Sequence, residues 1–520
     1  MSFSPSPSSA LGGGYGAPVR LATATTLVGV SLWLLTRLIK NASRKLPPGP
    51  KGLPLIGDIR HASDHGWLSS PERKNDYGEM MYVSVLGQGI LVLNSRRVAV
   101  DLLEKRSNIY SDRPHNIVLC DYMSEGLSLA STPYNDLLRR YRRATMDSFS
   151  KSGVSIFQPV QHREAMMLAL DLMKSPSDRE THLRRHSMSI MLSINYHLPP
   201  ARSESDPLLL GITDRIRHIS HTLEPGAHLV EFFPWLRYVP SMFAKWKREA
   251  QLWFVETTSL FERLVSNVAD DLANGIDKPS FAAALIKNQD KYNLSERERA
   301  WVAGTMLFAG GETASSILEW WLLAMVANPE IQTRAHSELD KVVGRARPPT
   351  FADLPSLPYI RAVVKETLRW AQVAPFGVPH RSTADDWYEG VFIPKGTICM
   401  PNIRMINSDT GVFGADAIRF NPDRYLDAAT EEREMGSTIF GFGRRVCLGR
   451  FIAEGTLAID VATLLWAMRF ERPEGVQGEL DTETCVLEGL SARPVRFEVR
   501  ASPRFPETKT LIVDALELYK

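Results

Sequence analysis

Hydrophobic residues between positions 98 and 344 recur mostly at the three- and four-residue spacing of amphipathic helices. Two β-rich runs precede this region, residues 82–86 and 90–93, and the Gly-Gln-Gly between them predicts a hairpin. Strand signals return at residues 391–397, where Pro and Gly indicate a turn between short strands. Long helical runs with a few short hairpins predict an α-rich α+β domain with small β-sheets.

One predicted helix is unusually long. Residues 295–298, Ser-Glu-Arg-Glu, fit a capping box, apolar residues recur from Trp301 to Leu323, and Asn328-Pro329 ends the pattern. At 1.5 Å per residue such a helix spans about 50 Å, enough to cross a domain. Its middle holds Gly310-Gly311, and glycines weaken the helical hydrogen-bond ladder, so we expect a local opening there.

The N-terminal segment has a pattern of its own. Residues 1–20 are rich in Ser, Pro and Gly and predict a disordered tail. Residues 21–35 carry no charge, and we expect 21–39 to form a transmembrane anchor, although the uncharged stretch is short of the roughly 17 to 25 residues that a membrane helix needs. The flanking arginines can extend it by snorkelling.

Basic residues follow this stretch in excess, which places the rest of the chain in the cytosol. A cleaved signal peptide is the alternative, but no small-x-small cleavage site stands out before the basic cluster. Residues 40–57 are basic and proline-rich, and their prolines fix φ and remove donors, so we expect a stiff hinge.

Composition narrows the function classes. The 61 basic and 59 acidic residues give a net charge of +2, which leaves no footprint for a nucleic-acid partner. The four cysteines lie far apart without Cys-x-x-Cys spacing, which favours a reducing compartment. A length of 520 residues allows about three domains, but without repeats or internal linkers a single large domain over 58–500 is at least as consistent. Residues 501–520 form a C-terminal extension to which the sequence assigns no role.

The most informative segment is residues 440–449, Phe-Gly-Phe-Gly-Arg-Arg-Val-Cys-Leu-Gly. Gly441 and Gly443 let backbone approach a flat cofactor, and Arg445 precedes Cys447 by two residues, where it can meet a carboxylate. Residues 450–459 predict a helix, so the sulfur would lie beside a helix N-terminus that lowers the pKa of the thiol. A buried structural cysteine in a glycine-rich turn is the alternative interpretation.

These ten residues match every fixed position of the haem-binding signature of the cytochrome P450 family, Phe-x-x-Gly-x-Arg-x-Cys-x-Gly, and the chain resembles that family over residues 46–500. The resemblance implies a single large domain that binds haem b through the thiolate of Cys447 as axial iron ligand. It also implies that Phe440, Gly441 and Gly443 shape the loop and that Arg445 binds a haem propionate. In this family thiolate donation favours cleavage of the O–O bond.

Other cations align with less specific family positions for the propionates: Arg142, Arg113 and His380. Leu138 stands where the family's Trp-x-x-x-Arg element has tryptophan, which weakens the assignment of Arg142. For His380 a hydrogen-bonded core histidine is an equally good interpretation.

The middle of the long helix reads Ala-Gly-Gly-Glu-Thr over residues 309–313 and resembles the family's oxygen-activation motif. A hydroxyl next to an acid can relay protons from solvent, so the resemblance implies catalytic roles for Glu312 and Thr313. Taken alone, Thr313 would read as a helix threonine bonded to the preceding turn and Glu312 as a solvated charge.

Glu366 and Arg369 lie three residues apart on one predicted helix face, a spacing that is ordinary for exposed ion pairs. Residues 420–425 resemble the family's Phe-x-Pro-x-Arg segment, and in the family its arginine, here Arg424, completes a buried triad with the first pair. We therefore expect these three residues to fix the loop that presents Cys447.

Segments that line the substrate pocket in the family fall on mostly apolar residues here, which implies an apolar substrate. These positions can equally be core. They are Phe308, Ala309, Phe376, Val378, Leu487 and Leu490.

The sequence contains no flavin or dinucleotide Gly-x-Gly-x-x-Gly element, so NADPH-derived electrons must come from a partner reductase. The resemblance implies a single-pass protein of the endoplasmic reticulum membrane that inserts one atom of O2 into an apolar small molecule. Local details are similar to fungal members in secondary metabolism, which act on terpenoids or aromatic polyketides. The alternatives are a reductase-independent enzyme that rearranges peroxides and a non-catalytic haem sensor.

Overall fold

The structure is a computed structural model that describes residues 45–53, 56–58, 71–203, 205–224, 226–426, 437–476, 478, 480–488 and 491–519. The expected disordered tail and membrane anchor, residues 40–44, 54 and 55 of the expected hinge, and Leu490 lie outside these residues. Within them, no helix is both long enough and apolar enough to cross a bilayer.

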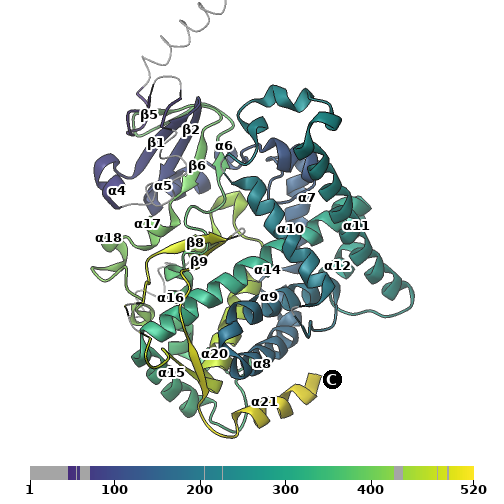
Figure 1. Ribbon diagram of the computed structural model, residues 1–520, viewed down its shortest axis with the longest axis vertical. Coiled ribbons are helices and arrows are strands. Elements are labelled where there is room, and N and C mark those ends of the chain that lie inside the picture. The colour runs from purple at the N-terminus through teal and green to yellow at the C-terminus, as the bar shows by residue number, and fades with distance from the viewer. Residues whose placement is uncertain are drawn as a thin grey trace, which may run out of the picture. The chain divides into compact units, whose positions relative to one another are not determined.

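Helices dominate the described chain, as the spacing of apolar residues predicts (Figure 1). The α-helices are α4 (Pro71–Tyr77), α5 (Arg96–Ala99), α6 (Ser107–Tyr110), α7 (Asp136–Ser148), α8 (Gln158–Lys174), α9 (Arg179–Tyr196), α10 (Pro207–Leu223), α11 (Lys245–Ala273), α12 (Phe281–Lys287), α13 (Gln289–Tyr292), α14 (Glu296–Ala327), α15 (Pro329–Val342), α16 (Pro358–Trp370), α17 (Ile403–Asn407), α18 (Thr410–Phe413), α20 (Arg450–Ala467) and α21 (Thr508–Leu516).

The strands are short and form small sheets. They are β1 (Met80–Val85), β2 (Gln88–Leu93), β3 (His380–Arg381), β4 (Asp386–Tyr388), β5 (Val391–Ile393), β6 (Ile398–Pro401), β7 (Met468–Glu471), β8 (Cys485–Glu488), β9 (Ser491–Pro494) and β10 (Arg500–Pro503). One sheet has the order β1-β2-β6-β3, and the pairs β7–β10, β4–β5 and β8–β9 are antiparallel.

The predicted hairpin is confirmed as β1 and β2, with a tighter turn than expected. Leu86 and Gly87 have φ of 48° and 82°, so these two residues alone make the turn and the strands include Gln88 and Gly89. Part of the proline-rich segment is bonded along β1, since Tyr82 donates its N–H to Pro48 O at 2.7 Å. That part is fixed to the sheet by hydrogen bonds.

The described chain divides into two compact units. The smaller contains residues 45–47 and 385–395, where β4 pairs with β5 and Phe392 donates its N–H to Lys45 O at 2.7 Å. The larger contains the remaining described residues, including every helix named above.

The long helix α14 organises the larger unit (Figure 1). Its predicted capping box is present, because the Ser295 hydroxyl accepts from Glu298 N–H and the Glu298 carboxylate accepts from Ser295 N–H. Its first half, around Trp301 and Leu307, belongs to a hydrophobic cluster with α7, α9, α11 and α12. Its second half, around Trp320 and Trp321, belongs to another with α8, α15, α16 and α20. Residues 309–316 lie between the two clusters.

The expected opening at Gly310-Gly311 is wrong, because α14 is helical without a break through these residues. The glycines instead admit neighbouring side chains. A Cβ at Gly310 would lie 2.6 Å from Met191 Sδ, and one at Gly311 would lie 2.7 Å from Met188 Cε. The two glycines therefore let α9 pack closely against α14.

The C-terminal extension is part of the packed unit. Strand β10 pairs with β7, Ile512 of α21 is fully buried, and the Tyr519 hydroxyl lies 2.6 Å from His162 Nδ1 on α8. Helix α8 in turn contacts α20, where Gln161 Nε2 donates to Ile452 O at 3.0 Å. The extension thus braces α8, a direct neighbour of the helix that follows Cys447.

Candidate active site around Cys447

The loop that carries Cys447 is held by backbone contacts that need glycine. Its two glycines have positive φ, 78° at Gly441 and 55° at Gly443. A Cβ at Gly443 would lie 2.2 Å from Leu103 O, so this position tolerates no side chain. Cys447 N–H donates to Phe440 O at 2.8 Å and closes the loop.

Cys447 is exposed, and its sequence neighbours Val446, Leu448 and Gly449 are half-buried. Helix α14 passes next to it, since a Cβ at Gly449 would lie 3.7 Å from Met306 Cε and 4.0 Å from Cys447 Sγ. An exposed sulfur and α14 therefore lie close together at this loop.

The expected lowering of the pKa of the thiol is wrong in the protein alone. Desolvation by the surrounding chain raises the pKa of Cys447, and it outweighs the Gly449 N–H at the helix N-terminus and the charges of Arg450 and Arg142, which lower the pKa. A metal ion bound to the sulfur would reverse this balance, because a coordinating thiol is deprotonated.

Three arginines gather beside this loop. Arg445 donates to Ser111 O at 2.8 Å and Thr132 O at 2.6 Å, Arg142 donates to Val446 O at 3.3 Å, and Arg113 donates to Val378 O at 2.7 Å. Arg142 thus reaches the cysteine loop even though Leu138 replaces the family's tryptophan.

These guanidinium groups repel one another. Desolvation, followed by repulsion from Arg445 and Arg142, lowers the pKa of Arg113 to about 9. Desolvation also lowers the pKa of Arg445 to about 10, opposed by Asp112. The arrangement favours binding of an anion that would neutralise the cluster.

His380 lies next to the same cluster as a buried, hydrogen-bonded residue. Its Nδ1 lies 2.7 Å from Tyr110 O, to which it must donate because a carbonyl only accepts. Desolvation, followed by repulsion from Arg113, lowers the pKa of His380 to about 3, so the ring is neutral. It would need a second proton, on Nε2, to donate to a carboxylate.

The acid and hydroxyl of α14 point to different surroundings. Thr313 is partly exposed and donates to Ala309 O at 2.9 Å, and Ala309 is itself exposed. Glu312 is 5% exposed and accepts from Arg493 Nη2 of β9 at 3.3 Å. The expectation that Glu312 is a solvated charge is therefore excluded.

Of the expected substrate-pocket residues, some are open and some are core. Val378 and Leu487 are 57% and 51% exposed. Phe308 and Phe376 are each 5% exposed; Phe308 packs edge-on against Phe261 with 5.0 Å between ring centroids. Burial in hydrophobic clusters leaves little of these two rings accessible to a ligand.

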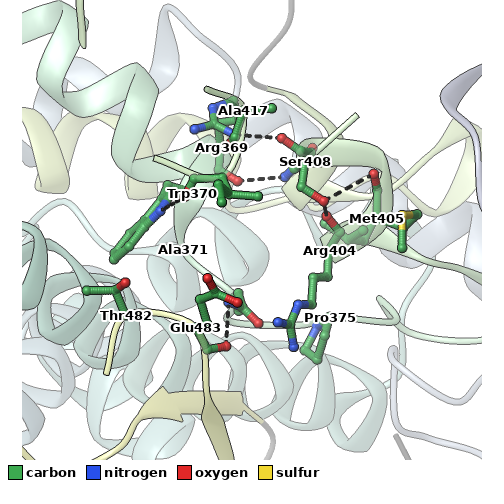
Figure 2. A pocket seen from close by; sticks show the side chains of 14 residues that line it. Arg369, Trp370, Ala371, Pro375, Arg404, Met405, Ser408, Ala417, Thr482 and Glu483 are labelled. Atoms are coloured by element: carbon green, nitrogen blue, oxygen red, sulfur yellow. Dashed lines mark hydrogen bonds between the residues drawn. The ribbon is translucent and has the colours of Figure 1, made fainter. Parts of the chain in front are cut away.

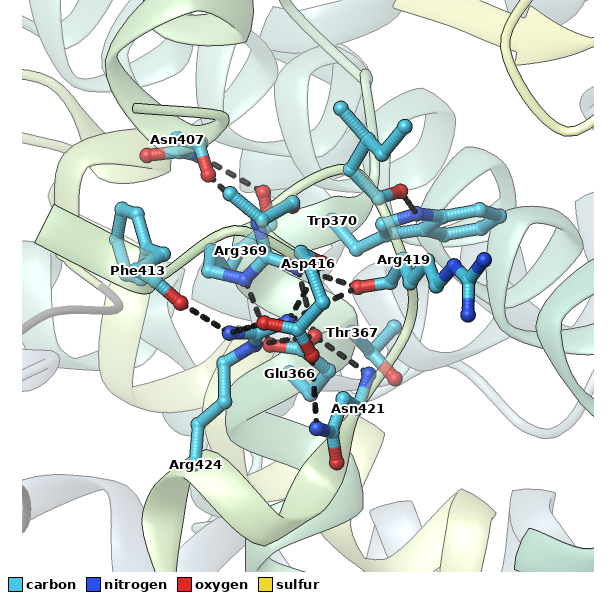
Figure 3. Close-up of polar contacts among 12 residues, drawn as sticks. Glu366, Thr367, Arg369, Trp370, Asn407, Phe413, Asp416, Arg419, Asn421 and Arg424 are labelled. Atoms are coloured by element: carbon cyan, nitrogen blue, oxygen red, sulfur yellow. Dashed lines mark hydrogen bonds and ion pairs between the residues drawn. The ribbon is translucent and has the colours of Figure 1, made fainter. Parts of the chain in front are cut away.

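The expected triad is buried and fully connected (Figure 3). Arg369 donates from Nε and Nη2 to the two oxygens of Glu366 at 2.7 and 2.6 Å, and Arg424 Nε lies 3.3 Å from Glu366 Oε1. The remaining Arg369 donors bond carbonyl oxygens of Asn407, Ala417 and Arg419. The bidentate pair lies on α16, and the carbonyls belong to the chain that leads to Cys447.

Asn407 and Thr438 connect the triad to the cysteine loop, and the sequence motifs missed both, as they missed Asp416, which pairs with Arg424. Asn407 Nδ2 donates to Arg369 O at 2.9 Å, and its Oδ1 accepts a hydrogen bond from Thr438 Oγ1. Thr438 O then accepts from Gly441 N–H at 3.0 Å. The Asp416 carboxylate accepts from Arg424 Nη1 at 2.9 Å and is a second counter-charge for that guanidinium. No local pattern marks Asn407 or Asp416, because only the fold brings them to the triad.

Comparison with known proteins agrees with this geometry. Residues 47–500 match the family model of cytochrome P450. Two cytochrome P450 monooxygenases of Armillaria gallica are 44% and 43% identical to the chain, over 96% and 94% of it and 98% and 97% of their own lengths. Cytochrome P450 monooxygenase 58 of Postia placenta is 40% identical, over 93% of this chain and 94% of its own.

The chain belongs to the cytochrome P450 family. Such identity over nearly the whole length supports monooxygenase activity and implies a thiolate-ligated haem. The residues present fit that group: an exposed sulfur lies near α14, and a cluster of guanidinium groups beside it favours the two carboxylates that haem b carries.

A separate small cavity of about 110 Å³ lies at the C-terminal end of α16 (Figure 2). Trp370 and Arg404 line it together with Glu483, whose backbone oxygen accepts from Gln372 Nε2 at 3.1 Å. None of its lining residues belongs to the cysteine loop or to α14, so it is distinct from the P450 active site.

The triad generates a testable prediction. Replacing Glu366 by alanine leaves the buried guanidinium of Arg369 without a carboxylate, at a cost of about 3 to 5 kcal/mol, and leaves Arg424 with Asp416 alone, so we expect Glu366→Ala to lose most haem incorporation. Haem bound per polypeptide, from the reduced carbon monoxide difference spectrum, measures it. Glu330→Ala, at an exposed glutamate of α15, is the control and should keep the haem content of the unaltered protein. Equal haem content in both variants would show that the triad does not fix the loop.

Proposed function

We propose that this P450 inserts one atom of O2 into an apolar small molecule and reduces the other to water, with electrons from a separate NADPH-dependent reductase. The observation that carries the proposal is the exposed Cys447 sulfur beside three arginines, with Ala309 and Thr313 open on the same α14 that passes the sulfur at Met306. When bound, thiolate-ligated haem supplies oxygen activation.

The chain's own residues provide ligation and orientation. Cys447 would hold the haem iron through its thiolate, and Arg445, Arg142 and Arg113 would hold the propionates. Each of these arginines already has a backbone carbonyl as partner, so its direction is set before a ligand arrives. His380 joins them only as a doubly protonated ring.

Protons reach the site through Thr313 and Glu312 in this proposal. Thr313 Oγ1 donates to Ala309 O, which leaves its lone pairs free to accept from a water on the open side of α14. Glu312 takes up a proton from the solvent side and passes it to that water. This pair also favours the monooxygenase over a peroxide-rearranging enzyme or a haem sensor, neither of which needs a proton relay.

The substrate is proposed to be apolar, a terpenoid or an aromatic polyketide of fungal secondary metabolism. The support is the apolar character of Ala309, Val378 and Leu487, which remain exposed, and the similarity to fungal relatives. Leu490 belongs to the same proposal from the sequence alone.

Arg444 and Arg450 are proposed as contacts for the acidic surface of the reductase. Both side chains are already oriented by aromatic rings: the guanidinium of Arg444 lies 5.2 Å from the Tyr134 ring centroid and that of Arg450 lies 4.4 Å from the Phe451 centroid. Such cation–π contacts hold the side chains in place without neutralising their charge.

The activity is tested in yeast that express the chain with a matched reductase and are fed terpenes and aromatic compounds. We expect a product heavier by one oxygen atom, absent in Cys447→Ala, together with the shifted Soret band of carbon monoxide on thiolate-bound haem. A product that forms without reductase would support the peroxide-rearranging enzyme. A sound Soret band with no NADPH consumption in the presence of any ligand would support the sensor.

The relay has its own prediction. Thr313→Ala should keep the haem and divert electrons to hydrogen peroxide, because water loses its hydroxyl partner; we expect product per NADPH to fall roughly ten-fold or more. Thr305→Ala is the control, since Thr305 back-bonds to Trp301 O in the same way, two turns earlier. An unchanged ratio of product to NADPH in Thr313→Ala would exclude the relay.

We also propose a single-pass anchor in the endoplasmic reticulum membrane, with the catalytic domain in the cytosol. The support is the uncharged stretch at residues 21–35 and its basic flank. A second apolar surface, residues 229–243 between α10 and α11, exposes Trp235, Tyr238 and Phe243 by 65%, 80% and 74%. Side chains of this kind favour the interface of a bilayer.

This proposal predicts the behaviour of a chain that lacks residues 1–39. We expect alkaline carbonate to release it from yeast microsomes while the full chain stays in the membrane pellet, because only a spanning helix resists extraction. The Soret band of the shortened chain is the control for folding. If carbonate leaves both chains in the pellet, residues 1–39 are not the anchor.

A further inference from the structure

Glu312 makes its closest charged contact with a residue far from it in sequence. Arg493, on β9, is 3% exposed, and its Nη2 lies 3.3 Å from Glu312 Oε1 and 2.8 Å from Ser315 Oγ. Its Nη1 donates to Glu319 Oε2 at 2.9 Å. One guanidinium therefore bridges two carboxylates that lie seven residues, about two turns, apart on α14.

The position of Arg493 is fixed independently of these ion pairs. The neighbouring carbonyl of Ala492 accepts from Ser316 Oγ at 2.6 Å and from Trp320 Nε1 at 3.1 Å, and Ala492 N–H donates to Val373 O at 2.7 Å. Strand β9 is thereby bonded to α14 along the stretch that carries Glu312. The backbone at Arg493 is therefore placed next to α14 without help from the ion pairs.

Other charged groups complete the surroundings of the two carboxylates. Arg184 of α9 lies 3.8 Å from Glu312 Oε1 and is 28% exposed, so it faces solvent at its outer side. Arg179 lies 4.0 Å from Glu319 Oε1. Desolvation raises the pKa of Glu319 despite the opposing charge of Arg493. Glu312 thus has two guanidinium neighbours, one deeply buried and one at the surface.

We propose that Arg493 is a positioning residue that keeps Glu312 ionised and turned toward β9, with Arg184 as its partner on the solvent side. The proposal rests on the relay role of Glu312 stated above. Burial of a carboxylate without a guanidinium favours the neutral acid. Arg493 therefore maintains Glu312 as a proton acceptor from the solvent side, and the proton then passes to the water at Thr313.

The first test is the infrared spectrum of the purified, haem-loaded protein at neutral pH. We expect Arg493→Gln to show a protonated-carboxyl band that is missing from the double variant Arg493→Gln, Glu312→Gln. With Arg493 in place, we expect the unaltered protein and Glu312→Gln to have the same intensity in that band. Glu319→Gln is the matched control, because it breaks the other half of the bridge and keeps the contact with Glu312. If Arg493→Gln and its double variant have identical spectra, Arg493 does not set the ionisation of Glu312.

The second test uses a more conservative variant, in case Arg493→Gln does not fold. Arg493→Lys keeps the charge, but a single ammonium group cannot bridge two carboxylates in the same geometry. We expect product per NADPH to fall roughly five-fold in Arg493→Lys at normal haem content. The double variant Arg493→Lys, Glu312→Gln should give the same product per NADPH as Glu312→Gln alone. Independent, multiplying effects of the two substitutions would overturn the proposal.

The two tests separate this proposal from the relay itself. If Glu312→Gln leaves product per NADPH unchanged, the relay role is wrong, whereas the infrared comparison still decides whether Arg493 holds Glu312 ionised. If Glu312→Gln uncouples the enzyme and Arg493→Lys does not, the relay stands and Arg493 is excluded as its positioning residue.

Discussion

The buried carboxylate of Glu366 is the interaction on which the presentation of Cys447 depends. Removing this single charge would leave Arg369 without a carboxylate in an interior that cannot solvate it, and Arg424 with Asp416 alone. Arg369 also satisfies three carbonyls of the chain between α17 and the loop, so the ion pair fixes backbone and not only side chains. From there Asn407 and Thr438 carry the constraint to Gly441 and the sulfur.

Helix α14 meets a different requirement, because it must support both hydrophobic cores and still offer polar groups at its middle. The structure resolves this by separating the cores, which contact the helix before residue 309 and after residue 316. Between them, Gly310 and Gly311 allow the methionines of α9 to fill one side, while Ala309 and Thr313 remain open on another. A continuous helix keeps these two sides apart. A helix whose backbone hydrogen bonds were broken at Gly310 and Gly311 would not.

The sequence predicted those features whose cause is local. The capping box of α14, the hairpin and the glycine-rich cysteine loop all follow from residues within a few positions of one another. What it missed depends on tertiary contact: the opening expected at Gly310 is prevented by helix packing, and the pKa of Cys447 is raised by desolvation that no spacing reveals. Arg493 lies 181 residues from Glu312, and no motif joins them.

The balance of buried charge differs between the triad around Glu366 and the cofactor site around Arg445 in this P450. Around Glu366, the arginine charges are met by Glu366 itself, by Asp416 and by backbone carbonyls, so nothing further needs to bind. Around Arg445, by contrast, desolvation lowers the pKa of three neighbouring guanidinium groups, repulsion lowers the pKa of Arg113 and Arg445 further, and Asp112 is the carboxylate that opposes this. Such an imbalance is unfavourable until an anion enters. The excess of positive charge beside an exposed sulfur is therefore the physical signature of the cofactor site, and Arg113 and Arg142 contribute to it from outside the motif that first indicated it.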